Sequence, residues 1–276
     1  MNGKLKLGVS TAAFFPLTLE ETFDILAQQP WNGIELMPQS PEECFPAFAD
    51  ELYALSGGRF EFCGIHFPQI LAPFLYNPYP SAFEFGQEIC RGLGELAGAL
   101  KCTTIVIHGP WANMSKGAFM EATLANLRLL CDTAIRHDVI IGLENTPGSP
   151  NGSSPETMIA FAAQIDRPNV GYTFDVTHTY QMNQDPMVYL RDLPSIAHVH
   201  ASDFNTETNQ RHTPPGQGVV DWNAVIGALW DRGFAGNFIL ELLWDTLQPD
   251  PVKALQESTA LLNPLFARWK ETTGSA

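Results

Sequence analysis

The chain is poor in positive charge. Its 276 residues include 15 Lys and Arg against 30 Asp and Glu, which gives a formal net charge of −15. A charge of this sign repels the phosphate backbone of nucleic acids, and no cluster of Lys or Arg offers a local basic groove. We therefore expect a small-molecule partner and not a nucleic acid.

Cysteines are few, and their spacing forms no known motif. The five cysteines are odd in number and include no CxxC spacing, so neither a disulfide framework nor a zinc knuckle is indicated. No apolar run reaches the length of a membrane span. Residues 7–17 follow two lysines but contain polar residues and a proline, and a convincing signal-peptide cleavage site is missing. The expected location is the cytoplasm, without a membrane partner.

Apolar residues make up 45% of the chain, and their runs alternate between the spacing of strands and the spacing of helices. Strand patterns lie at 5–10, 33–36, 61–66, 103–109, 139–145, 170–176, 196–203 and 237–243. Helical patterns lie at 18–29, 41–56, 82–100, 117–137, 155–165, 186–192, 221–233 and about 250–270. Strict alternation predicts a parallel sheet covered by helices. Eight repeats, with no GxGxxG after the first strand, favour an α/β protein with one (β/α)8 TIM-barrel domain over 1–276.

Three long connections, at 67–80, 146–154 and 203–220, are expected to be non-helical, and each directly follows a strand pattern. Loops in that position surround the active site of a barrel. These connections are therefore expected at the functional face.

Residues able to bind metals stand at the ends of the last four predicted strands, namely Glu144, Asp175, His200 and Glu241. The carboxyl ends of barrel strands converge, so these side chains should meet at the mouth. Three carboxylates packed without a cation would repel one another. The oxygen-rich set suits one divalent ion, Mn²⁺, Mg²⁺ or Co²⁺, and further histidines would favour Zn²⁺ or Fe²⁺. Alternatively, single members are helix caps or salt-bridge partners.

Two histidines, His66 and His108, end the third and fourth predicted strands beside Glu144. They either hold a second ion that shares Glu144 or contact oxygens of a substrate. Two further histidines lie nearby. His178 is expected to face the same cavity, and His198 to orient or pack one layer deeper.

Arg211 is one of few cations in the connection after the seventh predicted strand. Its guanidinium either binds a carboxylate or a hydroxyl-rich substrate, or pairs with Glu207 on the surface.

Several sequence strings together resemble one known family. They are LENTPG at 143–148, FDVTH at 174–178, HVHASD at 198–203, GQGVVDW at 216–222, GFAG at 233–236 and the later Glu241. The combination is similar to the xylose-isomerase-like TIM-barrel superfamily, over roughly residues 60–245. That group contains sugar isomerases and epimerases, inosose-processing enzymes and endonuclease-IV-type phosphodiesterases. The resemblance implies one divalent metal on Glu144, Asp175, His200 and Glu241, with His178 and Arg211 near the substrate.

The preferred function is a metal-dependent isomerase or epimerase. A metal would stabilise the enediolate that forms when a carbon beside a carbonyl loses its proton. Glu144 and Glu241 are the expected catalytic residues, one removing the proton and the other returning it. His66, His108, His178 and Arg211 are the expected substrate-binding residues. Few basic loop residues favour an unphosphorylated small sugar or a ketone-bearing polyol, and an oligomer is compatible with the sequence.

The alternative function is a multi-zinc phosphodiesterase of the endonuclease-IV type. In that interpretation, one ion lies on His66, His108 and Glu144, a second on the four-residue set, and a third on His178 and His212. Gln210 stands where the repair nucleases carry an acidic ligand, so the sequence departs from their pattern. A barrel that binds a ligand without catalysis is a third interpretation.

Overall fold

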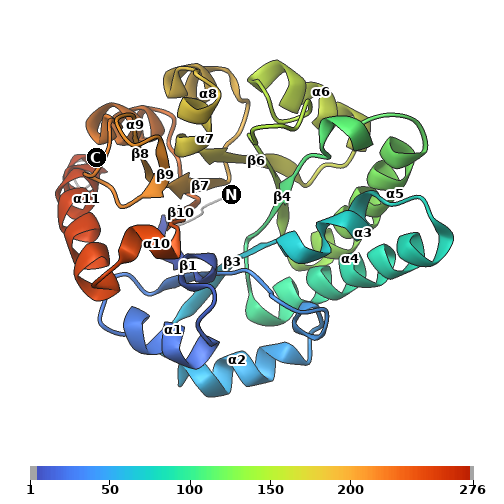
Figure 1. Ribbon diagram of the computed structural model, residues 1–276, viewed down its shortest axis with the longest axis horizontal. Helices are drawn as coiled ribbons and strands as arrows, with labels where there is room; N and C mark the ends of the chain where they lie inside the picture. The colour runs from blue at the N-terminus through green and yellow to red at the C-terminus, as the bar shows by residue number, and fades with distance from the viewer. Residues whose placement is uncertain (1–4, 274–276) are drawn as a thin grey trace.

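The computed structural model describes residues 5–273, and within them eight parallel strands close into a barrel (Figure 1). The order around the barrel is β1-β10-β7-β6-β5-β4-β3-β2. This closure confirms the predicted α/β barrel. The strands are β1 Lys6–Ser10, β2 Gly33–Leu36, β3 Glu61–His66, β4 Thr104–His108, β5 Ile140–Glu144, β6 Val170–Asp175, β7 His198–Ala201 and β10 Asn237–Leu240.

Helices surround the barrel, and Figure 1 shows the first and last, α1 and α11, on adjacent sides of the ring. Side chains join these two ends of the chain, because Trp31 Nε1 donates to Asn263 Oδ1 at 2.8 Å. The helices are α1 Leu19–Leu26, α2 Phe48–Ser56, α3 Ala72–Tyr76, α4 Pro80–Leu100, α5 Gly117–Ala134, α6 Pro155–Ile165, α7 Val176–Gln181, α8 Pro186–Asp192, α9 Trp222–Asp231, α10 Trp244–Leu247 and α11 Pro251–Thr273.

One of the three connections predicted to be non-helical, 67–80, contains helical structure, so that prediction was wrong for it, whereas the other two are confirmed. The connection 67–80 holds a 3-10 turn and α3, whose buried Leu75 and Tyr76 pack on the core. The connection 203–220 holds a hairpin of β8 Asp203–Asn205 and β9 Gln210–Thr213. Both segments are too short for a periodic sequence signal. The connection 146–154 contains no helix.

The barrel wall separates an apolar layer from a polar interior. Phe174, Val199 and Phe238 belong to the apolar core that the strands share with the surrounding helices. Side chains alternate along a strand, and the neighbours of these residues, such as Asp175 and His200, are polar and fully buried. A barrel interior is ordinarily filled by branched apolar residues, so this polar filling indicates a site.

Among residues 5–273, no helix is long and apolar enough to cross a membrane. All five cysteines are free and buried, in agreement with the spacing argument. The assignment of 1–276 to one domain stays a prediction, as does the cytoplasmic location, and residues 1–4 and 274–276 lie outside the described part of the chain.

Candidate metal centre

The four predicted ligands meet at the mouth of the barrel. Each of Glu144, Asp175, His200 and Glu241 offers an atom that lies within 4.8 Å of the atoms of the other three. Nδ1 of His200 is 3.2 Å from Glu241 Oε2, 3.4 Å from Glu144 Oε1 and 3.9 Å from Asp175 Oδ2. The structure thus brings together residues that lie up to 97 positions apart (241 − 144) in the chain.

Asp175 is held by the junction between β6 and α7. Its Oδ1 accepts the backbone N–H of His178 at 2.7 Å and so caps α7. Asn145, at the end of β5, accepts from the backbone N–H of Asp175 at 2.7 Å and donates to its carbonyl at 2.8 Å. These bonds fix the carboxylate while its Oδ2 stays free to face the other ligands. A helix cap and a metal ligand are therefore compatible in one residue.

Most ligand atoms of this cluster lack a hydrogen bond, although histidine nitrogens lie close to the oxygens of Glu144. Both carboxylate oxygens of Glu144, Oδ2 of Asp175 and Nδ1 of His200 are buried and make no hydrogen bond within the described residues. Leaving such atoms desolvated and unsatisfied costs free energy. A divalent cation among three oxygens and one nitrogen would satisfy them together. The donor set therefore fits a metal ion.

The pKa values in the cluster are shifted by burial and by the close approach of charged groups. Burial, helped by the charges of Glu144 and Glu241 and opposed by His178, raises the pKa of Asp175 to about 7. Burial opposes ionisation of Glu144 as well, but His108 and His200 hold its pKa well below the usual value. Burial would lower the pKa of His200, yet the surrounding carboxylates raise it well above the usual value. Protons and a cation therefore compete for the same atoms.

His66 and His108 form a second group with Glu144, again with ligand atoms within 4.8 Å of one another. His66 Nδ1 lies 2.9 Å from the carbonyl of Phe67, so Nδ1 carries the proton and Nε2 faces Glu144 Oε2 at 3.5 Å with a free lone pair. His108 has the opposite arrangement: the Gln69 amide donates to Nδ1 at 3.0 Å, which places the proton on Nε2, 3.0 Å from Glu144 Oε2. Nε2 of His66 is therefore able to bind a metal ion, and Nε2 of His108 is able to donate a hydrogen bond.

A third group joins Asp175, His178 and His212. His178 Nδ1 is 2.8 Å from the carbonyl of Asn145 and 3.1 Å from Glu144 Oε1. His212 comes from β9, and its ring lies 5.3 Å from that of His178. Burial lowers the pKa of His212 to about 4, which leaves the imidazole neutral and able to bind a cation. Sequence reasoning gave His212 only a secondary place, because the hairpin that folds it over the mouth was not recognised.

Arg211 lies outside these three groups and lines a cavity at the mouth. No ion pair joins it to Glu207 within residues 5–273, so the surface pairing considered from the sequence is not found. The cavity measures about 780 Å³ and takes lining residues from the same segments that carry the ligands, including Pro147, Tyr180, Gln181, Gln210, Arg211 and Leu243. It therefore lies next to the candidate metal centre.

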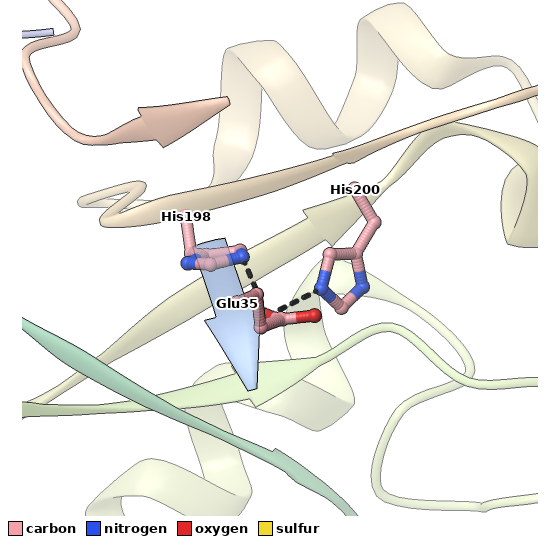
Figure 2. A group of neighbouring side chains, drawn as sticks. All are labelled: Glu35, His198 and His200. Carbon is pink, nitrogen blue, oxygen red and sulfur yellow. Dashed lines mark hydrogen bonds and ion pairs between the residues drawn. The ribbon is translucent and has the colours of Figure 1, made fainter. Parts of the chain in front are cut away.

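Glu35 is the buried polar residue that the sequence analysis missed. It lies on β2, is fully buried, and its Oε2 is 3.0 Å from Nε2 of His200 and 2.9 Å from Nε2 of His198 (Figure 2). Burial opposes its ionisation, but the two imidazoles hold its pKa well below the usual value. The available signal was a carboxylate inside the otherwise apolar buried strand Gly33–Leu36.

Comparisons with known proteins agree with the barrel fold. A family model described as xylose isomerase-like TIM barrel matches residues 23–265. An uncharacterized protein of Methanocaldococcus jannaschii is 29% identical over 258 residues, covering 90% of this chain and 92% of its own. A D-tagatose 3-epimerase-like protein has a TM-score of 0.76 at 23% identity, covering 97% and 99%. A 3-keto-D-glucoside 4-epimerase from E. coli has 0.75 at 18%, covering 95% and 100%.

Proposed function

The chain belongs to the xylose isomerase-like TIM barrel family, and we propose that it is a divalent-metal-dependent isomerase or epimerase of a small sugar or a ketone-bearing polyol. One observation carries the proposal. Two glutamates, Glu144 and Glu241, share a buried cluster with Asp175 and His200, and the unpaired atoms of that cluster suit a cation. The names of the epimerases that share this fold support it.

The metal would be held by Glu144, Asp175, His200 and Glu241. A divalent ion bound there supplies Lewis acidity that stabilises negative charge developing on substrate oxygens. The residues of the chain have separate tasks. His108 Nε2 and the guanidinium of Arg211 are the hydrogen-bond donors proposed to orient hydroxyl groups, and the buried walls exclude water.

Proton transfer is assigned to Glu144 and Glu241, whose side chains differ in exposure to solvent. The side chain of Glu241 is 13% exposed, whereas that of Glu144 is fully buried beside four histidine rings. We infer that Glu241 exchanges its proton with solvent more readily and that Glu144 returns the proton it receives. A transfer on opposite faces of one carbon gives epimerisation, and a transfer between neighbouring carbons gives isomerisation.

The substrate is proposed to enter through the mouth cavity. Its volume of about 780 Å³ lies within the usual range for small-molecule pockets. Gln181, Asn183, Asn209 and Gln210 line it with amides, which donate to and accept from hydroxyl groups, and Arg211 is the cation among its lining residues. This lining supports a neutral, hydroxyl-rich ligand.

The test is exchange of a substrate C–H proton with deuterated water, measured by NMR over a panel of free ketoses and keto-glycosides with Mn²⁺, Co²⁺, Mg²⁺ or Zn²⁺. Exchange is expected with the wild type and is expected to disappear in Glu144→Gln and Glu241→Gln. Glu95→Gln serves as a control, because this carboxylate pairs with Arg136 and His137 on helices outside the barrel. Failure of the metal-loaded wild type to exchange any member of the panel would contradict the proposal.

A second function is favoured by the two histidine groups. A multi-zinc phosphodiesterase would use His66 and His108 with Glu144 for one ion, and Asp175, His178 and His212 for another. The proton that Gln69 places on His108 Nε2 weighs against the first of these, as does the acidic chain. Metal analysis discriminates: one equivalent supports the sugar enzyme, whereas two or three zinc equivalents with cleavage of an abasic-site duplex support the hydrolase.

A further inference from the structure

The barrel interior contains a buried carboxylate that belongs to none of the catalytic assignments above. Glu35 lies on β2, which neighbours β1 and β3 and is separated from β7 by β1 and β10. Its side chain nevertheless reaches His198 and His200 on β7, as Figure 2 shows. A contact across the barrel between non-adjacent strands requires that the side chains of both strands point into the barrel interior.

The backbone around Glu35 is shaped for this reach. The pairing of β2 with β3 changes register between Ile34 and Glu35, which marks a β-bulge or irregularity. Bulges of this kind re-aim a side chain next to functional sites. Gly64, the partner of Glu35 on β3, leaves space as well, because a Cβ there would lie 3.0 Å from Cε1 of His198.

The contacts of His198 determine which of its nitrogens carries the proton. Nδ2 of Asn237 lies 3.3 Å from Nδ1 of His198 and cannot accept a hydrogen bond from it, so the proton of neutral His198 is on Nε2. That nitrogen is 2.9 Å from Glu35 Oε2. The same carboxylate oxygen accepts a hydrogen bond from Nε2 of His200 at 3.0 Å. Two imidazoles thus hold one carboxylate oxygen in place.

The consequence for His200 concerns its other nitrogen. Because Nε2 donates to Glu35, the lone pair of neutral His200 is on Nδ1. Nδ1 is the atom that faces Glu144, Asp175 and Glu241. We propose that Glu35 is the positioning residue of the metal centre: it fixes the tautomer and ring orientation of His200 so that Nδ1 points to the cation. This inference rests on the metal centre of the proposed function.

A cation between Glu35, His198 and His200 is the competing explanation of the same contacts, since these three residues also gather within 4.8 Å. The hydrogen bond of His200 to Glu35, and the amide nitrogen of Asn237, which lies beside Nδ1 of His198 and cannot accept, place protons on both Nε2 atoms. Nitrogens that carry protons offer no lone pair to a metal. The group is therefore assigned to hydrogen bonding and not to a further ion.

The first experiment measures Mn²⁺ and Zn²⁺ binding by titration calorimetry in the wild type, Glu35→Gln and His198→Gln. Removing an outer partner of a ligating histidine typically lowers metal affinity by about 10- to 100-fold. We expect a loss in this range for Glu35→Gln, and a smaller loss for His198→Gln, which disturbs the orientation of Glu35 alone. Glu95→Gln is the control, because it converts to an amide a carboxylate that pairs with Arg136 and His137 outside the ligand groups, and its affinity should stay within twofold.

The second experiment uses a readout that reduced stability alone would not change. In ¹⁵N spectra of the Zn²⁺-loaded, histidine-labelled wild type, His200 should show a metal-bound Nδ1 and a slowly exchanging Nε2–H. Glu35→Gln should lose the slow Nε2–H signal, and Glu95→Gln should keep it. If Glu35→Gln does not fold, His198→Gln decides the question through the same two readouts.

The outcomes separate this inference from the proposed function. A wild type that binds no divalent ion overturns both. A wild type that binds one ion, with unchanged affinity and an unchanged His200 signal in Glu35→Gln and His198→Gln, overturns the positioning role alone. Loss of one whole ion equivalent from a two-ion protein on substitution of Glu35 would also overturn it, because Glu35 would then be a ligand.

Discussion

His198 and His200 lie two residues apart on β7, and both are fully buried inside the barrel. Beside His198, the amide of Asn237 donates its two hydrogens to the carbonyl of Cys63 at 2.9 Å and to Thr103 Oγ1 at 3.0 Å, and its Nδ2 faces the ring of His198 at 3.3 Å. Around Nδ1 of His200, by contrast, lie both carboxylate oxygens of Glu144 and Oδ2 of Asp175, none of which has a hydrogen bond within residues 5–273. We call His198 and Asn237 the lower layer, and Glu144, Asp175 and Nδ1 of His200 the upper layer. The lower layer keeps one unpartnered atom, Nε2 of His198, whereas the upper layer gathers four in one place, where a cation or protons would satisfy them. The number of unpartnered atoms that share one place therefore separates the two layers, and burial alone does not.

The largest expected effect comes from adding a divalent cation, which the unpartnered atoms of the upper layer would bind. Addition of a divalent ion at about 1,000 times its Kd stabilises a protein by about 4 kcal/mol, which corresponds to about 8 to 16 °C in Tm for chains of comparable size. Scanning calorimetry with Mn²⁺, Zn²⁺ or EDTA measures this shift. Equal Tm values under all three conditions would remove the contrast between the layers.

The next effect comes from Glu144, the carboxylate that contacts most of the other groups in the upper layer. Glu144→Gln should lower ion affinity by about 100-fold or more, because an anionic ligand is lost from a dry site. Calorimetric titration measures the change. Unchanged affinity would mean that the ion binds at another site.

A substitution in the lower layer should have the opposite effects: it should lower stability and leave ion affinity nearly unchanged. Asn237→Ala removes hydrogen bonds to the Cys63 carbonyl and to Thr103, each of which keeps another partner, so the loss of unfolding free energy should be about 0.5 to 1.5 kcal/mol. Ion affinity should change by less than about threefold, because Glu35 still accepts from His200. Urea unfolding and ion titration on the same variant test both parts. A large loss of affinity with normal stability would show that the layers are not separable.

The smallest expected effect is a dependence of ion affinity on pH. Burial raises the pKa of Asp175 to about 7 in the ion-free protein, whereas an unfolded Asp titrates near about 3.9. This raised value stabilises the ion-free fold at low pH, and the contribution is lost as pH rises through 7. The ion must displace the same proton below pH 7, so its affinity should rise by up to about tenfold per pH unit towards 8.

The Tm shift caused by Mn²⁺ should accordingly be larger at pH 8 than at pH 6. The raised pKa of His200 acts in the same direction. Thermal unfolding at pH 6, 7 and 8, with and without Mn²⁺, gives the comparison. A shift that shrinks as pH rises would exclude proton competition at Asp175.

Much of the barrel was predictable from the sequence, and the reasons are local. Strands such as Gly33–Leu36 and Glu61–His66 match their predicted bounds, because short apolar runs between polar segments are read directly. The convergence of Glu144, Asp175, His200 and Glu241 followed from strand ends in a closed parallel sheet. Their roles as ligands and catalysts stay predictions.

The missed residues depend on contacts that no local pattern records. Glu35 looks like an ordinary charged residue until β2 and β7 face each other across the barrel. His212 reaches the mouth only because β8 and β9 pair and fold the loop back. The proton positions on His66 and His108 depend on Phe67 and Gln69, which are fixed only in three dimensions.

The β8–β9 hairpin has a consequence for how this barrel can diversify. It carries Gln210 and Arg211 into the mouth cavity but contributes none of the four atoms of the main ligand cluster. Under the proposed function, exchanges of Gln210 and Arg211 are therefore expected to alter which compounds are admitted while leaving the four ligand atoms and Glu35 in place, provided that His212, which contacts Glu241, is kept. Grafting the hairpin between homologues with this histidine retained would then change substrate preference without changing the metal centre.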